Sequence, residues 1–146
     1  MYNKNMKIIK LKEVDSTHRY IKDYILENAY RGPLCILSDF QTQGIGSRGN
    51  SWIGKEGNVF FSFVVDKEFL PNDLPLQSSS IYFSYLLKDI LKQMGSFVWL
   101  KWPNDFYIDD KKVGGTITTV SKNLIYCGIG INLKSVSEDF GKLDIN

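Results

Sequence analysis

A lysine and an aspartate lie seven residues apart in a stretch that is rich in turn-forming residues. Residues 101–105 read Lys-Trp-Pro-Asn-Asp, and Lys112 follows in the run Lys-Lys-Val-Gly-Gly. An ammonium group stabilises a phosphate or a carboxylate, and an aspartate can accept a proton from an incoming amine. Lys112 and Asp105 are therefore candidate catalytic residues. Taken alone, each could equally be an ordinary turn residue.

Two glycine-rich segments flank this stretch. Residues 41–52 read Gln-Thr-Gln-Gly-Ile-Gly-Ser-Arg-Gly-Asn-Ser-Trp, and residues 128–132 read Gly-Ile-Gly-Ile-Asn. Glycines let the backbone approach a ligand closely and direct N–H groups at an anion. Arg48 offers a fixed positive charge and Trp52 a flat face for a purine ring, unless the tryptophan simply fills the core. The segments together predict one site for an anionic, nucleotide-like ligand.

The first glycine segment also matches the dinucleotide-binding pattern Gly-x-Gly-x-x-Gly at Gly44, Gly46 and Gly49. That pattern requires a helix that opens at its third glycine. Residues 50–58 contain two further glycines and are poor helix formers, so we expect no Rossmann fold here.

The apolar patterns predict two helices and several strands. One helix runs from the capping residues 15–17 to about residue 30, and the other covers residues 78–94. Helices and strands do not alternate strictly, and the strands gather late in the chain. The expected fold is therefore α+β, with a mixed or mostly antiparallel sheet and helices packed on one side. The strands are expected over residues 7–14, 34–38, 58–65, 97–102, 106–108, 113–120 and 124–133.

The composition is that of a single soluble domain. The 146 residues are 43% hydrophobic and 23% charged, with a net charge of +2 and interspersed signs, so we expect no binding to DNA or RNA. No apolar run approaches the roughly 20 residues that span a bilayer, and we expect no membrane association and no signal peptide. Cys35 and Cys127 lie in apolar runs, which fits free thiols in the cytoplasm. With His18 as the sole histidine, no zinc or other protein-bound metal site is expected.

These motifs, in this order, resemble the catalytic domain of the biotin–protein ligases. Residues 101–105 match the family's Lys-Trp-Pro-Asn-Asp, Lys112 matches the lysine of its Lys-x-x-Gly motif, and residues 128–132 match its Gly-x-Gly-Ile-Asn. Residues 15–17 resemble the Asp-Ser-Thr-Asn at the start of that domain, with His18 in place of the asparagine. The likeness covers roughly residues 7–133.

The resemblance implies a ligase that joins biotin to ATP, with Mg²⁺, and passes it to a lysine of a biotin carboxyl carrier protein. Lys112 would bridge carboxylate and phosphate, Asp105 would hold or deprotonate the acceptor lysine, and Arg48 would support the phosphate. His18 is expected to be an exposed first-turn residue. The implied biotin contacts are Ser16, Thr17, Gln41, Gly44, Gly46, Lys112, Gly115, Gly128 and Gly130, and the implied nucleotide contacts are Arg48, Trp52, Asn104 and Asn132.

The chain departs from the family in the first glycine segment. The family carries Gly-Arg-Gly-Arg-x-Gly-Arg-x-Trp there, whereas Ile45, Ser47 and Asn50 stand at three of the arginine positions. We expect Arg48, one residue beyond Ser47, to supply the missing charge from a shifted loop.

Residues 1–146 are expected to form one catalytic domain without the winged-helix DNA-binding segment and without the family's C-terminal part. An exposed edge strand could pair two copies into a homodimer. A lipoate–protein ligase, which shares the fold and the adenylate chemistry, remains an alternative. A module that binds biotin or its adenylate without turnover is another.

Overall fold

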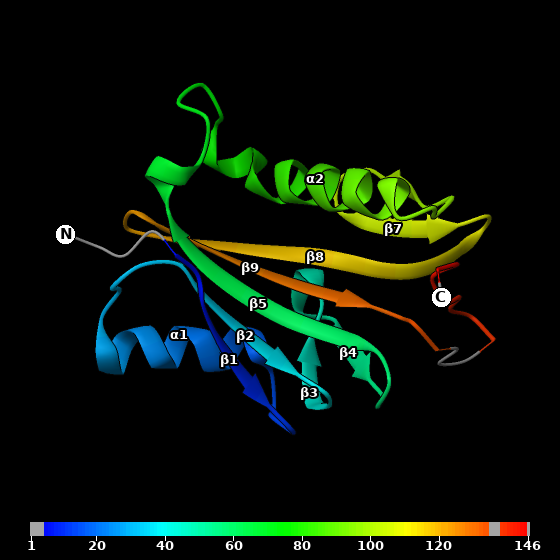
Figure 1. Ribbon diagram of the computed structural model, residues 1–146, viewed down its shortest axis with the longest axis horizontal. Coiled ribbons are helices and arrows are strands. Elements are labelled where there is room, and N and C mark those ends of the chain that lie inside the picture. Colours follow the sequence, from blue (N-terminus) through cyan, green and yellow to red (C-terminus); the bar gives the residue numbers. More distant parts are fainter. Residues whose placement is uncertain (1–4, 135–137, 146) are drawn as a thin grey trace.

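The computed structural model describes residues 5–134 and 138–145, and Figure 1 shows the arrangement of their elements. A large sheet forms the centre of the domain. Its strand order is β1-β2-β5-β9-β8-β7-β6, in which β1 and β2 are parallel and the other neighbours are antiparallel. The strands are β1 (Lys7–Leu11), β2 (Leu34–Ser38), β5 (Val59–Asp66), β6 (Trp99–Lys101), β7 (Asp105–Ile108), β8 (Lys111–Ser121) and β9 (Leu124–Ile131). The predicted mixed α+β class is confirmed.

The two long helices lie on opposite faces of this sheet, so the expectation that both cover one side is wrong. Helix α1 (Thr17–Asn28) packs with Tyr126 of β9 through Ile21. Helix α2 (Ser79–Gln93) packs with the next residue of that strand, Cys127, and with Ile129. Successive strand residues point to opposite faces, so the two helices cannot share one. The apolar strands β5 and β9 are accordingly buried from both sides, as is usual for central strands.

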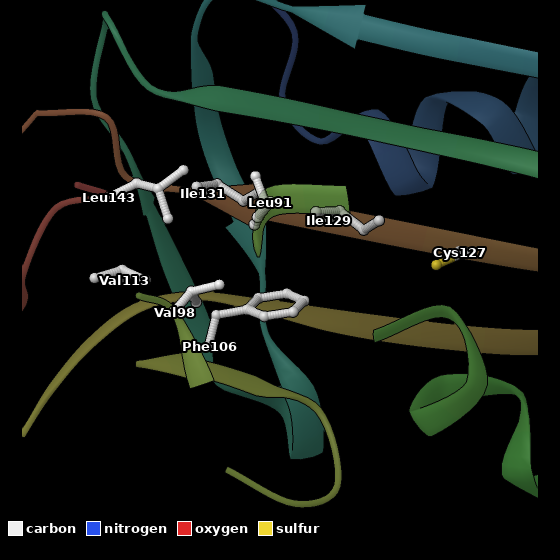
Figure 2. Packing of buried hydrophobic residues seen from close by; sticks show 8 residues of the cluster. All are labelled: Leu91, Val98, Phe106, Val113, Cys127, Ile129, Ile131 and Leu143. Carbon is white, nitrogen blue, oxygen red and sulfur yellow. The ribbon is translucent and has the colours of Figure 1, made fainter. Parts of the chain in front are cut away.

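The core on the α2 face gathers around the end of β9 (Figure 2). Leu91 of α2 contacts a cluster that includes Ile129, Phe106 of β7 and Val113 of β8. Leu143, near the end of the chain, belongs to the same cluster and is only 4% exposed. The segment 138–145 therefore packs against the sheet. Asp144 fastens it further by accepting hydrogen bonds from Ser96 Oγ and from the N–H of Phe97.

The first glycine segment forms a β-hairpin. Strands β3 (Gln41–Ile45) and β4 (Ser51–Gly54) pair as a separate two-stranded sheet, joined by a 3-10 turn over Ser47–Gly49. Arg48 (φ 58°) and Gly49 (φ 75°) adopt the left-handed conformation that closes this connection. No α-helix opens at Gly49, which confirms that the Gly-x-Gly-x-x-Gly match is coincidental. Two further 3-10 turns, over Lys67–Phe69 and Leu76–Ser78, connect β5 to α2.

Candidate active site

A pocket lies between the β3–β4 hairpin, the start of α1 and the strands β8 and β9. In Figure 1, strands β3 and β4 run across the direction of β9. The pocket brings together segments that are more than 100 residues apart in the chain. Most of the predicted site residues line it, namely Ser16, Thr17, Gln41, Gly46, Trp52, Asn104, Asp105, Lys112, Gly115, Gly128 and Gly130.

Glycines on neighbouring strands form the floor of the pocket. Gly115 of β8 pairs with Gly130 of β9, and Gly128 lies two residues before Gly130 on the same face of the sheet. A Cβ atom on Gly130 would lie 2.5 Å from Trp52 Nε1, so the indole packs directly on this backbone. The absence of side chains here lets Trp52 and a ligand approach the sheet.

Replacing Gly130 with alanine is expected to displace Trp52 and destabilise the domain by about 1–3 kcal/mol, because the added methyl group overlaps the indole. Urea unfolding monitored by circular dichroism measures the loss. In a Trp52→Phe background the same alanine is expected to cost less, since the clashing nitrogen is gone. Equal losses in the two backgrounds would show that the Trp52–Gly130 contact does not cause the effect.

Small neutral hydrogen-bonding groups line the pocket at the start of α1. Ser16 caps the helix by accepting from the N–H of Arg19 at 3.3 Å, which leaves its own O–H proton available. The hydroxyls of Thr17 and Ser62 lie 2.9 Å apart, and Gln41 Oε1 accepts from the N–H of Thr17 at 2.8 Å. Ser16, Thr17 and Ser62 are each at most 3% exposed. This end suits a neutral, polar ligand group, since no charged side chain lies among these residues.

His18 is buried at this end, with 4% of its surface exposed, and the expectation of an exposed residue is wrong. Its Nε2 lies 3.0 Å from Thr119 Oγ1. Its Nδ1 is buried and has no hydrogen-bond partner among the described residues. Burial lowers the pKa of His18 to about 4, with a smaller contribution from Lys22, so the ring is neutral at pH 7.

The buried histidine is expected to make the domain less stable as the pH falls from 6.5 to 4. In this window the unfolded chain binds a proton on His18 that the folded chain excludes, so the free energy of unfolding decreases. The difference between a pKa of 6.5 and one of about 4 corresponds to about 3 kcal/mol. Urea unfolding at pH 7 and pH 4.5 measures the change. The His18→Asn variant, which keeps every carboxylate, should lose less stability over this range, and an identical loss would contradict the prediction.

Lys112 and Asp105 form an ion pair at the other end of the pocket. Lys112 Nζ lies 2.9 Å from Asp105 Oδ1, and each side chain is roughly three-quarters buried, with 26% and 28% exposed. The ammonium group also lies 5.3 Å from the centre of the Trp52 ring, within the range of a cation–π contact. An ammonium group has three donors, so Lys112 can hold an anion while Asp105 keeps it in place. This end therefore suits an anionic ligand group.

The C-terminal segment borders the cationic end. The N–H of Gly141 donates to the carbonyl of Lys112 at 2.9 Å, and the Phe140 ring lies edge-on to Trp52 with centroids 6.1 Å apart. The hydrogen bond fixes the backbone of Lys112 from the side opposite β7, and the ring contact holds the segment against Trp52.

Three predicted site residues do not line this pocket. Arg48 is exposed and lines an adjoining groove together with Lys22, so its charge does not point into the pocket itself. Gly44 packs against the backbone of the paired strand β4, where a Cβ atom would be 2.5 Å from the carbonyl oxygen of Trp52. Asn132 is buried and donates from Nδ2 to the carbonyl of Gly141 at 3.2 Å, which anchors the C-terminal segment. Asn104 lines both the pocket and the adjoining groove, and its amide donates to the carbonyl of Thr116 at 2.8 Å.

The structure adds lining residues that the motifs had not indicated. Ser62 is a small polar residue in the centre of the apolar run Val-Phe-Phe-Ser-Phe-Val-Val, and that contrast was a usable signal. Ile45 and Ser47, two of the positions where the family carries arginine, also line the pocket.

The fold and the pocket together define an α+β domain with a pocket that has a neutral polar end and a cationic end. A match to the Biotin/lipoate A/B protein ligase family covers residues 11–133, and the chain belongs to this family.

Curated relatives carry the same domain within longer proteins. The chain is 31% identical over 127 residues to the bifunctional ligase/repressor BirA of Escherichia coli (strain K12), covering 82% of this chain and 38% of that protein. It is 30% identical over 129 residues to biotin–protein ligase 2 of Arabidopsis thaliana, with the same coverage of 82% and 38%. The chain thus spans well under half of the length of these relatives.

Solved structures share the fold. The biotin acetyl coenzyme A carboxylase synthetase of Helicobacter pylori with bound biotinylated ATP superposes with a TM-score of 0.90 at 39% identity, covering 97% of this chain and 67% of that one. The biotin protein ligase of Aquifex aeolicus in complex with biotin and ATP gives 0.67 at 34% identity, covering 92% and 58%. A lipoate protein ligase of Thermoplasma acidophilum, at 14% identity and a TM-score of 0.59, shares the fold alone.

Proposed function

We propose that this domain catalyses ATP-dependent ligation of biotin to a lysine of a biotin carboxyl carrier protein, through biotinyl-5′-AMP. The observation that carries the proposal is a single pocket with buried hydroxyl and amide groups at one end and the Lys112–Asp105 pair at the other. Biotin has the matching polarity, with a neutral ureido group at one end and a carboxylate at the other. Relatives whose structures hold biotin with ATP, or biotinylated ATP, support the assignment.

In the first step a carboxylate oxygen of biotin attacks the α-phosphorus of ATP, and pyrophosphate leaves. Two anions must meet, so the site has to supply positive charge rather than a nucleophile. Lys112 fits this role because its ammonium group is held by Asp105 and lies beside the Gly115–Gly130 floor. Trp52, whose ring lies 5.3 Å from Lys112 Nζ, offers a flat surface for the nucleotide next to that charge.

In the second step the amine of the acceptor lysine attacks the acyl carbon of biotinyl-5′-AMP, and AMP leaves. The ammonium group of the lysine must lose two of its three protons on the way to the secondary amide, and solvent can take one of them. Asp105 is the carboxylate among the lining residues and can receive one. Asp105 would then serve both steps, because it holds Lys112 in the first and accepts a proton in the second. Its direct contact with Lys112 fits both tasks.

We propose that Mg²⁺ enters with ATP and is held mainly by the phosphate oxygens. Mg²⁺ in nucleotide sites is commonly bound by one or two carboxylates together with the phosphates. Here Lys112 already contacts Oδ1 of Asp105, so the protein has little carboxylate to offer. Asn104, which lines the pocket, would contact Mg²⁺-bound water or a phosphate oxygen.

Nothing in this proposal involves DNA or a membrane. No helix in residues 5–134 and 138–145 has the length and apolar character to cross a bilayer. The thiols of Cys35 and Cys127 are free and buried, and burial raises the pKa of Cys35 to about 11. Inert thiols of this kind fit a reducing compartment, which supports a cytoplasmic location.

Biotin-dependent exchange of labelled pyrophosphate into ATP tests the first step on this 146-residue chain. Exchange with biotin and not with lipoate is the expected result. Exchange with lipoate alone would favour the lipoate ligase instead. Biotin binding without exchange would favour a binding module. This module is the second candidate because Ile45, Ser47 and Asn50 replace arginines of the family.

A further inference from the structure

His18 offers one buried ring nitrogen that the fold itself does not use. The side chain is 4% exposed, and its Nδ1 has no partner among the described residues. The residue lines the pocket, and Nδ1 lies over the floor, 3.0 Å from the position that a Cβ atom on Gly128 would take. Leaving a buried polar atom unpaired is unfavourable, and a bound ligand that donates to it removes this cost.

The hydroxyl groups around His18 supply donors, and their oxygens also keep lone pairs that can accept. The Ser16 hydroxyl accepts from the helix and keeps its own proton, and within the Thr17–Ser62 pair one of the two hydroxyl protons is not used. These protons suit the carbonyl oxygen of a ureido group. The N–H groups of the same ligand require acceptors, and Nδ1 of His18 is a buried one that no described residue uses.

We propose that His18 Nδ1 accepts a hydrogen bond from a ureido N–H of biotin, and that His18 thereby selects biotin over ligands without such a donor. The inference rests on the proposed function. It requires the tautomer in which Nε2–H donates to Thr119 Oγ1, 3.0 Å away, which leaves the lone pair on Nδ1. Position 18 is one where this chain departs from the family's asparagine, whose side-chain oxygen reaches about as far as Nδ1 of a histidine.

Two substitutions separate the nitrogens of the ring. His18→Asn places an oxygen near the position of Nδ1, whereas His18→Gln places its polar atoms near Nε2 and leaves nothing at Nδ1. Isothermal titration with biotin is expected to give at least tenfold weaker binding for His18→Gln and binding within about threefold of the wild type for His18→Asn. Thermal unfolding of both variants verifies that the fold is retained. Equal affinities for the two variants would overturn the proposal, because the ring would then matter only for packing.

Nitrogen-15 NMR provides a readout that a packing role would not change. His18 is the sole histidine, so its two ring nitrogens give unambiguous signals. We expect Nδ1 to be unprotonated at pH 7 and its signal to shift when biotin is added, with little change on adding lipoate, whose dithiolane ring has no N–H. An unchanged Nδ1 signal in a sample that binds biotin would refute the hydrogen bond. A wild-type chain that binds no biotin at all would instead refute the proposed function.

Discussion

Replacing Lys112 with methionine is expected to reduce biotin-dependent pyrophosphate exchange by roughly a hundred- to a thousandfold. Methionine keeps most of the length of the side chain and removes its charge, so the change isolates the electrostatic contribution. The ammonium group is the cation among the residues that line the pocket, and Asp105 at 2.9 Å holds it there. Without it, the biotin carboxylate and the α-phosphate would meet with no compensating charge from the pocket.

The neighbouring lysine provides a matched control. Lys111 is exposed and donates from Nζ to the carbonyl of Glu138 at 2.9 Å, outside the pocket. The Lys111→Met variant is expected to keep an exchange rate close to that of the wild type. Binding of biotin should weaken far less than the exchange rate in Lys112→Met, since the ureido end does not involve this residue. Similar rates for Lys112→Met and Lys111→Met would remove Lys112 from the mechanism.

The sequence predicted the elements well because their local patterns are strong. The apolar run of β5 and the capped start of α1 each follow from neighbouring residues. The face on which each helix packs depends on contacts between distant segments. Successive residues of β9, such as Tyr126 and Cys127, are both apolar, so their pattern could not assign a helix to either face.

The pocket residues that belong to sequence motifs were predictable. Those whose position depends on packing between distant segments were less so. His18 follows the helix cap and would be exposed on an isolated helix. It is buried because the start of α1 lies against Gly128, more than 100 residues later. Asn132 shows a second case, since a residue that the motif marks as a nucleotide contact also donates to the carbonyl of Gly141. In both cases the neighbouring residues do not reveal whether the side chain contacts a ligand or stabilises the fold.

Asp105→Asn is expected to lower the transfer of biotin to the carrier lysine by about a hundredfold or more, and to change pyrophosphate exchange by less than about tenfold. Asparagine keeps the shape of the side chain and can still accept a hydrogen bond from Lys112, but it does not accept a proton. The first step needs the charge of Lys112, which remains. The second step needs a base for the incoming ammonium group, which is lost.

Single-turnover transfer from preformed biotinyl-5′-AMP to a carrier domain measures the second step alone. Asp109→Asn is the control, because Asp109 is exposed in the β7–β8 turn at φ 51°, a conformation that asparagine tolerates well. Raising the pH should partly restore transfer by Asp105→Asn, since a larger share of the acceptor lysine is then already deprotonated. Parallel losses in exchange and transfer, with no recovery at high pH, would mean that Asp105 acts only by positioning Lys112.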